Sequence, residues 1–277
     1  MAMDIRRLSA FSDADQGGNP AGVWIGEIFP DDATMQSVAA DVGYSETAFA
    51  VPQDDGFRVR YFSPEAEVPF CGHATIALGA ALAEHFGDGV FKLQLNEAQI
   101  SVEGRKQGRL TAAALQSPPT HSQPVSRPLL SEAMSLLDLQ AEDIDLRIPP
   151  ALINGGAQHL VLAVNRRETL KSMRYDFETG RGLMVREGLV TILLVFAETS
   201  RLFHTRNPFA FGGVYEDPAT GAASAAFAGY LRDIGWDHGG VIDIVQGEDM
   251  GSRSRIHAEF SDVPGSSIRV SGTARAL

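Results

Sequence analysis

The chain is organised around one stretch, Tyr61-Phe-Ser-Pro-Glu-Ala-Glu-Val-Pro-Phe-Cys-Gly-His-Ala-Thr75, which continues as Ile-Ala-Leu-Gly-Ala-Ala-Leu-Ala83. Alternating apolar residues over 57–62 predict a half-buried strand, and the prolines after it end the strand and open a loop. Residues 74–83 carry almost no polar side chains, which predicts a helix buried on all sides. The start of such a helix presents free N–H groups and a positive dipole end, which favour a carboxylate or phosphate. We therefore expect a binding site at His73.

A similar arrangement recurs about half a chain later. A strand at 200–204 leads through a loop rich in proline and glycine, 207–213, to a second run of small residues, 214–231. In each copy a glycine, Gly72 or Gly221, is expected to turn the chain tightly into the helix. Two such copies predict two similar domains whose helix N-termini face one ligand in a shared cleft.

The composition is that of an ordinary globular protein, and it argues against several classes of function. The chain has 277 residues, of which 44% are hydrophobic and 21% charged. A net charge of −12 argues against nucleic-acid and anionic-membrane partners. Residues 1–8 do not resemble a signal peptide, and no apolar run is long enough to span a membrane. One cysteine, Cys71, excludes an intrachain disulfide and a cysteine-based zinc cluster, and a reducing cytoplasm is the expected location.

The order of strands and helices predicts an α+β fold with two pseudo-symmetric domains. Most of the chain consists of short strands joined by tight turns, with one small-residue helix in each half. Further helices are expected at 31–42, at 131–139 with Ser131 as its cap, and at 166–173. Pro118-Pro119 cannot lie inside a sheet and therefore predicts the linker between domains 1–118 and 119–264. Two placements stay open for the last strand, 265–277, which either remains in the second domain or returns to the first.

Several short motifs follow one another along nearly the full length of the chain. They are Gly18-Asn-Pro-Ala21, Ser45-Glu-Thr-Ala-Phe49, Glu67-Val-Pro-Phe-Cys-Gly-His-Ala-Thr75, Glu216-Asp-Pro-Ala-Thr-Gly221 and Gln246-Gly247. In this order they resemble the phenazine-biosynthesis PhzF-like isomerase family. The resemblance implies the diaminopimelate epimerase-like fold, in which each domain is a strand barrel around a central helix and the active site lies in the cleft. It also implies a homodimer that uses no cofactor and no metal.

The resemblance assigns chemistry to three residues. Glu46 corresponds to the glutamate that moves a proton within a dihydro-hydroxyanthranilate ring in the isomerase for which the family is named. Its apolar and hydroxyl neighbours suit that role, because a partly desolvated carboxyl group can both accept and return a proton. His73 and Asp217 match the family's Gly-His-Ala-Thr and Glu-Asp-Pro motifs and are expected to orient the substrate. The structural alternatives are a solvated strand-edge carboxylate for Glu46, a helix-cap histidine for His73 and a helix N-cap for Asp217.

Six further residues are expected to contact the substrate. They are Asn19, Ser45, Gly72, Thr220, Gly221 and Ala222, of which the two glycines lie at turns whose N–H groups would hold a substrate carboxylate. Two positions depart from the family pattern. Ala222 stands where the family offers a serine hydroxyl to the substrate, and Ser9 stands where the family has an aspartate. Both departures leave the identity of the substrate open.

The sequence therefore predicts a cofactor-independent isomerase that transfers a proton on a small carboxylate-bearing substrate. The first alternative is a non-catalytic or degenerate binder of small carboxylates, which Ala222 suggests. The second alternative is a thiol-dependent hydrolase or racemase, because related racemases exchange a proton between two opposed thiols. The turn at 217–221 contains no cysteine, so two-thiol racemisation within one chain is excluded, and packing is the simpler explanation for Cys71.

Overall fold

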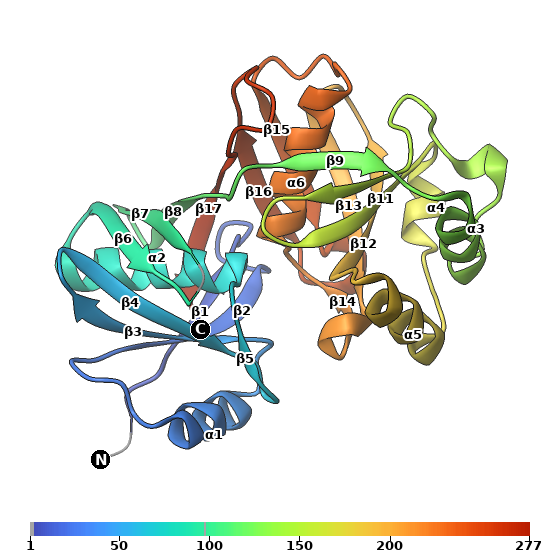
Figure 1. Cartoon of the computed structure of the whole chain (residues 1–277). Helices are drawn as coiled ribbons and strands as arrows, with labels where there is room; N and C mark the ends of the chain where they lie inside the picture. Colours follow the sequence, from blue (N-terminus) through green and yellow to red (C-terminus); the bar gives the residue numbers. More distant parts are fainter. Residues whose placement is uncertain (1–2, 97) are drawn as a thin grey trace. The chain divides into compact units, whose positions relative to one another are not determined.

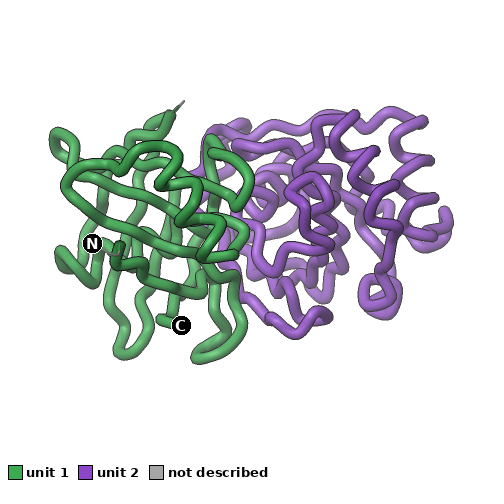
Figure 2. Tube along the Cα trace, turned by 90° about the horizontal axis from the view of Figure 1, so that it is seen from below, with its two compact units in different colours: residues 1–116, 271–277 green, residues 117–270 purple. Residues whose placement is uncertain are grey.

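The computed structural model describes residues 3–96 and 98–277 (Figure 1). The chain divides into two compact units, one of Met1–Gln116 with Ser271–Leu277 and the other of Ser117–Val270 (Figure 2). The C-terminal residues thus belong to the same unit as the N-terminal half. Among the described residues, none of the helices combines the length and the apolar character needed to cross a bilayer.

The first unit is an eight-stranded barrel. Its strands, in order around the barrel, are β1 (Arg6–Ala10), β2 (Asn19–Ile25), β3 (Thr47–Gln53), β4 (Gly56–Phe62), β6 (Gly89–Gln94), β7 (Gln99–Gln107), β8 (Leu110–Gln116) and β17 (Arg269–Ala276). Each strand pairs with the next, and β17 pairs with both β8 and β1, which closes the barrel. The two-residue strand β5 (Glu67–Val68) forms a hairpin with β4.

The small-residue helix α2 (Gly72–Phe86) lies inside this barrel, where the strands enclose it (Figure 1). Every residue from Gly72 to Ala83 is buried, as the sequence predicts. The fit depends on glycine, because a Cβ atom at Gly104 of β7 would lie 2.2 Å from the carbonyl oxygen of Gly79. The lack of a side chain at Gly79 and Gly104 is therefore what lets β7 lie close against the helix.

The helix predicted at 31–42 is confirmed as α1 (Asp32–Val42). The side chain of Asp31 caps it by accepting a hydrogen bond from the N–H of Thr34, and Gly43 ends it in the left-handed conformation. Its buried residues pack on aromatic side chains of β3 and β4 to form a small core outside the barrel, made of Met35, Ala39, Phe49 and Phe62.

The second unit is built on a mixed sheet around α6 (Gly221–Asp233). Its strands pair in the order β9 (His121–Pro124), β10 (Ala151–Asn154), β11 (Gln158–Val164), β12 (Thr191–Ala197), β13 (Leu202–Phe209), β15 (Val241–Gln246) and β16 (Ser254–Glu259). β14 (Val214–Asp217) forms a hairpin with β13 and leads into α6. Almost all of α6 is buried, like α2 in the first unit.

Strands β11 and β12 are parallel, and almost every residue of β11 is buried, as expected for a strand covered on both faces. Alternate residues, including Leu160, Leu162 and Leu194, join a core with the outer helices α3 (Arg127–Leu136), α4 (Arg167–Lys171) and α5 (Phe177–Glu187). The remaining elements are the short 3-10 helices η1 (Ala141–Asp143), η2 (Ala210–Gly212) and η3 (Glu248–Met250). The predicted α+β class is therefore confirmed.

Three local predictions are wrong. The helix expected at 131–139 begins at Arg127, because the hydroxyl of Ser126, and not that of Ser131, accepts the capping hydrogen bond from Leu129. The turn-forming residues over 12–20 predict a loop, but Asn19 is the first residue of β2 and pairs with Ala10 of β1. Gly72 and Gly221 are the first residues of their helices and do not have the left-handed backbone that a tight glycine turn uses.

Candidate active site

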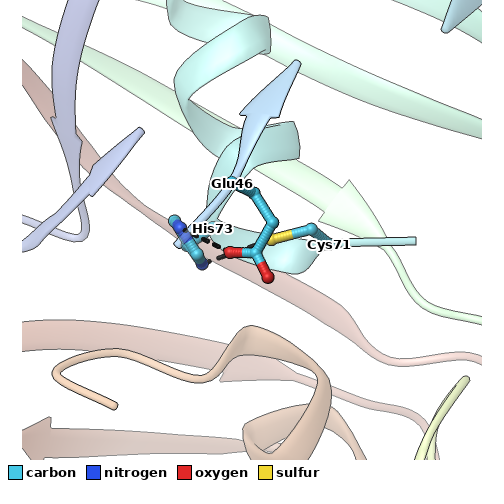
Figure 3. Close-up of side chains that lie close together, drawn as sticks. All are labelled: Glu46, Cys71 and His73. Atoms are coloured by element: carbon cyan, nitrogen blue, oxygen red, sulfur yellow. Dashed lines mark hydrogen bonds and ion pairs between the residues drawn. The ribbon is translucent and has the colours of Figure 1, made fainter. Parts of the chain in front are cut away.

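Glu46 lies directly before β3, and the sheet fixes its backbone. Its carbonyl oxygen accepts a hydrogen bond of 3.2 Å from the N–H of Gly22 in β2. Its side chain is buried, with the residue only 8% exposed, and Figure 3 shows the carboxylate directed at His73 and Cys71. The structural alternative of a solvated edge carboxylate is therefore wrong, because this side chain faces the start of α2 and not solvent.

His73 stands in the first turn of α2 with a different neighbour at each ring nitrogen. Its Nδ1 lies 3.3 Å from Sγ of Cys71, and its Nε2 lies 3.3 Å from Oγ of Ser45 and 3.4 Å from Oε2 of Glu46. The ring is 5% exposed. Thiol, imidazole and carboxylate are thus arranged in a row, which we call the Cys71–His73–Glu46 triad.

The triad contains a buried acceptor atom that lacks a donor. Within the described chain, Oε2 of Glu46 has no hydrogen-bond partner, although His73 is nearby. A buried polar atom without a hydrogen bond costs free energy, and few native structures tolerate many of them. An atom of this kind in a row of titratable groups is well suited to receive a proton from a ligand.

The triad also has the composition of a metal site, since each residue offers a ligand atom and these atoms lie within 4.8 Å of one another. Sulfur, nitrogen and oxygen donors together suit zinc. However, Cys71 and Glu46 contact opposite nitrogens of the ring, while one ion binds only one of them. The arrangement as it stands therefore fits proton transfer through the ring better than chelation.

A second set of contacts fixes the start of α2. The carbonyl oxygen of Cys71 accepts hydrogen bonds from the N–H of Thr75 at 3.0 Å and from its hydroxyl at 2.7 Å. The hydroxyl of Tyr61 in β4 lies 2.7 Å from the same Thr75 oxygen. Burial raises the pKa of Tyr61, so this hydroxyl stays neutral. Strand β4 of the barrel thus fixes the first turn of α2 through the contact between Tyr61 and Thr75.

In the second unit, Asp217 ends β14 and is 5% exposed. The N-cap of α6 is Thr220, whose hydroxyl donates a hydrogen bond to Oδ2 of Asp217. The alternative of Asp217 as the helix N-cap is therefore wrong. Gly221 is buried as the first helical residue, and Ala222 follows it half-buried.

Gln246, the last residue of β15, completes this second site, although it was not among the residues expected to contact the substrate. Its Oε1 accepts a hydrogen bond of 3.1 Å from the N–H of Thr220, while its Nε2 donates to the carbonyl oxygen of Asp217 at 2.7 Å and to the Thr220 hydroxyl at 2.9 Å. With only 1% exposure, it has no access to solvent. The available signal was the Gln246-Gly247 motif, in which a polar residue ends a buried strand.

The two remaining expectations concern the N-terminal strands. Asn19 is buried at the start of β2, 3% exposed. Ser9, one of the two departures from the family pattern, donates a hydrogen bond of 2.7 Å from its hydroxyl to the carbonyl oxygen of Gly17. Arg275 donates to the same oxygen at 3.3 Å. Ser9 thus holds the loop that precedes Asn19.

Comparison with known proteins adds information that the geometry does not contain. The sequence pattern of the family described as phenazine biosynthesis-like protein matches residues 8–277. A relative named as an uncharacterized isomerase of Pseudomonas aeruginosa is 31% identical over 234 residues, 83% of this chain and 82% of the relative. The trans-2,3-dihydro-3-hydroxyanthranilate isomerase of the same organism is 29% identical over 277 residues, 98% of this chain and 95% of that enzyme.

A solved structure supports the fold. The crystal structure of a PhzF-family phenazine biosynthesis protein from Bacillus anthracis matches with a TM-score of 0.85 and 20% identity, covering 100% of this chain and 98% of the other. At this level of identity the likeness bears on the fold alone, and it confirms the fold that the sequence motifs predicted.

Proposed function

This chain belongs to the phenazine biosynthesis-like family and is an isomerase, and we propose that it moves a proton within a small carboxylate-bearing substrate through Glu46. The observation that supports this most strongly is the buried Oε2 of Glu46, which has no hydrogen-bond donor in the described chain and lies 3.4 Å from Nε2 of His73. Such an atom is free to take a proton from a substrate carbon.

The proposed reaction needs no second reactant, because the proton only changes its place on the substrate. The carboxylate of Glu46 takes a proton from one carbon of the substrate, and the resulting carboxylic acid returns it to another carbon. The negative charge that develops meanwhile on the substrate is stabilised by the N–H groups at the start of α2 and by His73. No cofactor is needed for a proton shift of this kind.

We propose that the second unit binds the same substrate. Asp217, Thr220 and the N–H groups of Gly221 and Ala222 would hold its polar groups, with Gln246 keeping Asp217 and Thr220 in position. A helix N-terminus without acidic side chains in its first turn, as in α6, suits a carboxylate. Because Ala222 offers no hydroxyl, we expect a substrate with one polar group fewer at that point than the family serine would accommodate.

The first test is proton NMR in heavy water with a panel of small cyclic and amino carboxylates. The panel includes trans-2,3-dihydro-3-hydroxyanthranilate, the compound in the name of one relative. We expect deuterium to enter a substrate carbon with the wild type and with Glu65→Gln, whose carboxylate is exposed, but not with Glu46→Gln. Exchange that persists in Glu46→Gln would show that another group carries the proton.

The same experiment separates the alternatives. A compound that binds tightly to the wild type and never exchanges would favour the carboxylate binder over the isomerase. Activity that survives Cys71→Ala would remove the thiol-dependent hydrolase or racemase. Homodimer formation remains a prediction from the family resemblance, which light scattering would test, and a cytoplasmic location remains a prediction from the single cysteine.

A further inference from the structure

The Cys71–His73–Glu46 triad has the connectivity by which enzymes activate a thiol, although proton transfer by Glu46 does not use the sulfur (Figure 3). We propose that Cys71 is a reactive thiolate and a site of reversible covalent modification by small disulfides. The proposal concerns the chemistry of the sulfur and holds whether or not the isomerase proposal is correct.

The surroundings of Cys71 favour the charged form of the thiol. Its Sγ lies 3.3 Å from Nδ1 of His73, close enough for the imidazole to take the thiol proton. Cys71 is also the N-cap residue of α2, so the sulfur stands at the positive end of the dipole of a helix that runs to Phe86. Both features stabilise negative charge on sulfur, and both are known to activate cysteines.

Glu46 supplies the third group. The Glu46 side chain is 11% exposed, and its Oε2 lies 3.4 Å from the opposite ring nitrogen, Nε2, without a hydrogen-bond partner in the described chain. A carboxylate on the far nitrogen stabilises the imidazolium that forms when the ring takes the thiol proton. The row of three groups is therefore complete as a thiol–imidazole–carboxylate system.

The modification proceeds by thiol–disulfide exchange. The Cys71 sulfur attacks one sulfur of the incoming disulfide, the old S–S bond breaks, and a new S–S bond joins Cys71 to one half of the molecule. The other half leaves as a thiolate, while the proton of Cys71 remains on His73. Added thiol reverses the exchange. The adduct occupies space beside His73 and Glu46, so it would also block the proposed isomerase reaction.

The chain contains a single cysteine, so the reactivity of Cys71 can be measured without interference from other thiols. Every thiol reaction therefore reports on Cys71, with Cys71→Ser as the blank. We would measure the rates with iodoacetamide and with an aromatic disulfide near neutral pH, on the native protein and on the same protein unfolded in urea. We expect the native thiol to react about tenfold faster than the unfolded one, because an unpaired thiol is only a few per cent thiolate under these conditions. A native rate equal to or below the unfolded rate with both reagents would overturn the proposal in favour of a packed, inert thiol.

Two variants and a matched control assign the effect to the triad. His73→Asn should lower the native rate about tenfold, and Glu46→Gln should lower it by a smaller factor, about threefold. His85→Asn removes an exposed histidine of the same helix and should leave the rate unchanged. An unchanged rate in a folded His73→Asn, verified by circular dichroism, would contradict the proposal. If that variant does not fold, the comparison of native and unfolded wild type still decides the question.

These measurements need no substrate, so they are independent of the proposed function. Fast thiol reaction together with substrate exchange that survives Glu46→Gln would uphold the thiolate and refute the proton carrier. A slow thiol reaction together with loss of exchange in Glu46→Gln would refute the thiolate and uphold Glu46 as the proton carrier.

Discussion

The first turns of α2 and α6 are preceded by similar sequences, yet the two sites are completed in opposite ways. At α2, the polar side chains form a row of titratable groups, and one carboxylate oxygen lacks a hydrogen bond in the described chain. At α6, Gln246 ties Asp217 and Thr220 into a closed hydrogen-bond network. The first arrangement suits a group that must change its protonation state. The second suits a rigid binding surface.

The hairpins that lead into α2 and α6 each contain an arginine–glutamate ion pair, but the two pairs differ in burial. Arg60 of β4 donates two hydrogen bonds to Glu67 of β5, and Arg206 of β13 donates two to Glu216 of β14. The side chains of the first pair are 17% and 26% exposed, and those of the second only 9% and 3%. The second hairpin thus depends on a buried ion pair, in keeping with a site built for rigidity.

The largest expected effect separates chemistry at α2 from binding at α6. Glu46→Gln should lower kcat by about 10³-fold, the usual contribution of a general acid or base. Asp217→Asn should mainly raise KM, by about tenfold, because it weakens a contact that stabilises the bound substrate and the transition state equally. Steady-state kinetics on whichever substrate the exchange experiment identifies would measure both constants.

The contrast would break if Asp217→Asn lowered kcat as much as Glu46→Gln and left KM unchanged. Asp217 would then act on the reacting atoms, and the two helix starts would share the chemistry. Glu65→Gln serves again as the control for a lost negative charge.

The next effect concerns the two ion pairs. Glu216→Gln should lower the free energy of unfolding by about 3 kcal/mol, because it leaves the buried guanidinium of Arg206 without its counter-charge. Glu67→Gln should cost less than about 1 kcal/mol, because solvent and Asp32 remain near Arg60. Urea unfolding of the two variants beside the wild type gives both numbers. Equal losses would mean that burial does not distinguish the hairpins.

The sequence predicted those parts of the fold and site that depend on local patterns. The small-residue helices and the helix over 31–42 are visible in the sequence and confirmed in the structure. The same applies to the burial of Glu46 and His73, which the motif around each residue suggested.

The start of α3 and the whole of α5 were not predicted, although both helices carry capping residues. Pro128 lies in the first turn of α3, where proline is favoured, and it marks Ser126 as the cap. The helix α5 was not predicted, although Asp176 caps it and Gly188 ends it. Two glycines inside it, Gly180 and Gly182, weaken the helical pattern, and packing on α3 and the sheet overrides that weakness.

The contacts that complete each site could not be predicted, because they depend on tertiary pairing. Gln246 reaches Thr220 only because β15 pairs beside β13, and no local pattern contains that neighbour. The position of Cys71 Sγ at Nδ1 of His73 depends on the orientation of two side chains in one turn, which sequence motifs do not encode.

A smaller effect tests the rigidity of the α6 site. Gln246→Leu should lower the free energy of unfolding by about 2 kcal/mol, because it removes the buried hydrogen bonds that the amide makes to the N–H of Thr220 and to the carbonyl oxygen of Asp217. Gln116→Leu is the matched control, since Gln116 also ends a strand but is exposed, and it should change stability by less than about 0.5 kcal/mol. Thermal or urea unfolding measures both. A Gln246→Leu protein as stable as the wild type would show that the network is not what stabilises this end of the sheet.

The smallest expected effect concerns His159, a buried histidine for which the described residues provide no charged partner. His73 of the first unit lies between a thiol and a carboxylate, whereas His159 of β11 is fully buried with its Nδ1 2.8 Å from the hydroxyl of Thr191. Burial lowers the pKa of His159 from its ordinary value of 6.5 to about 3. Below about pH 6.5 the unfolded chain therefore binds a proton that the folded protein does not, and stability falls as the pH falls.

Between about pH 7 and about pH 5.5 this difference should cost about 1 kcal/mol, and His159→Gln should remove that part of the pH dependence. The glutamine can still bond the Thr191 hydroxyl, so any loss of stability that it causes on its own should be the same at both pH values. Urea unfolding of wild type and variant at the two pH values measures the difference directly. If the gap between wild type and His159→Gln stays constant over this range, His159 takes up its proton alike in the folded and the unfolded protein. The contrast between an inert histidine in the second unit and a working one in the first is then wrong.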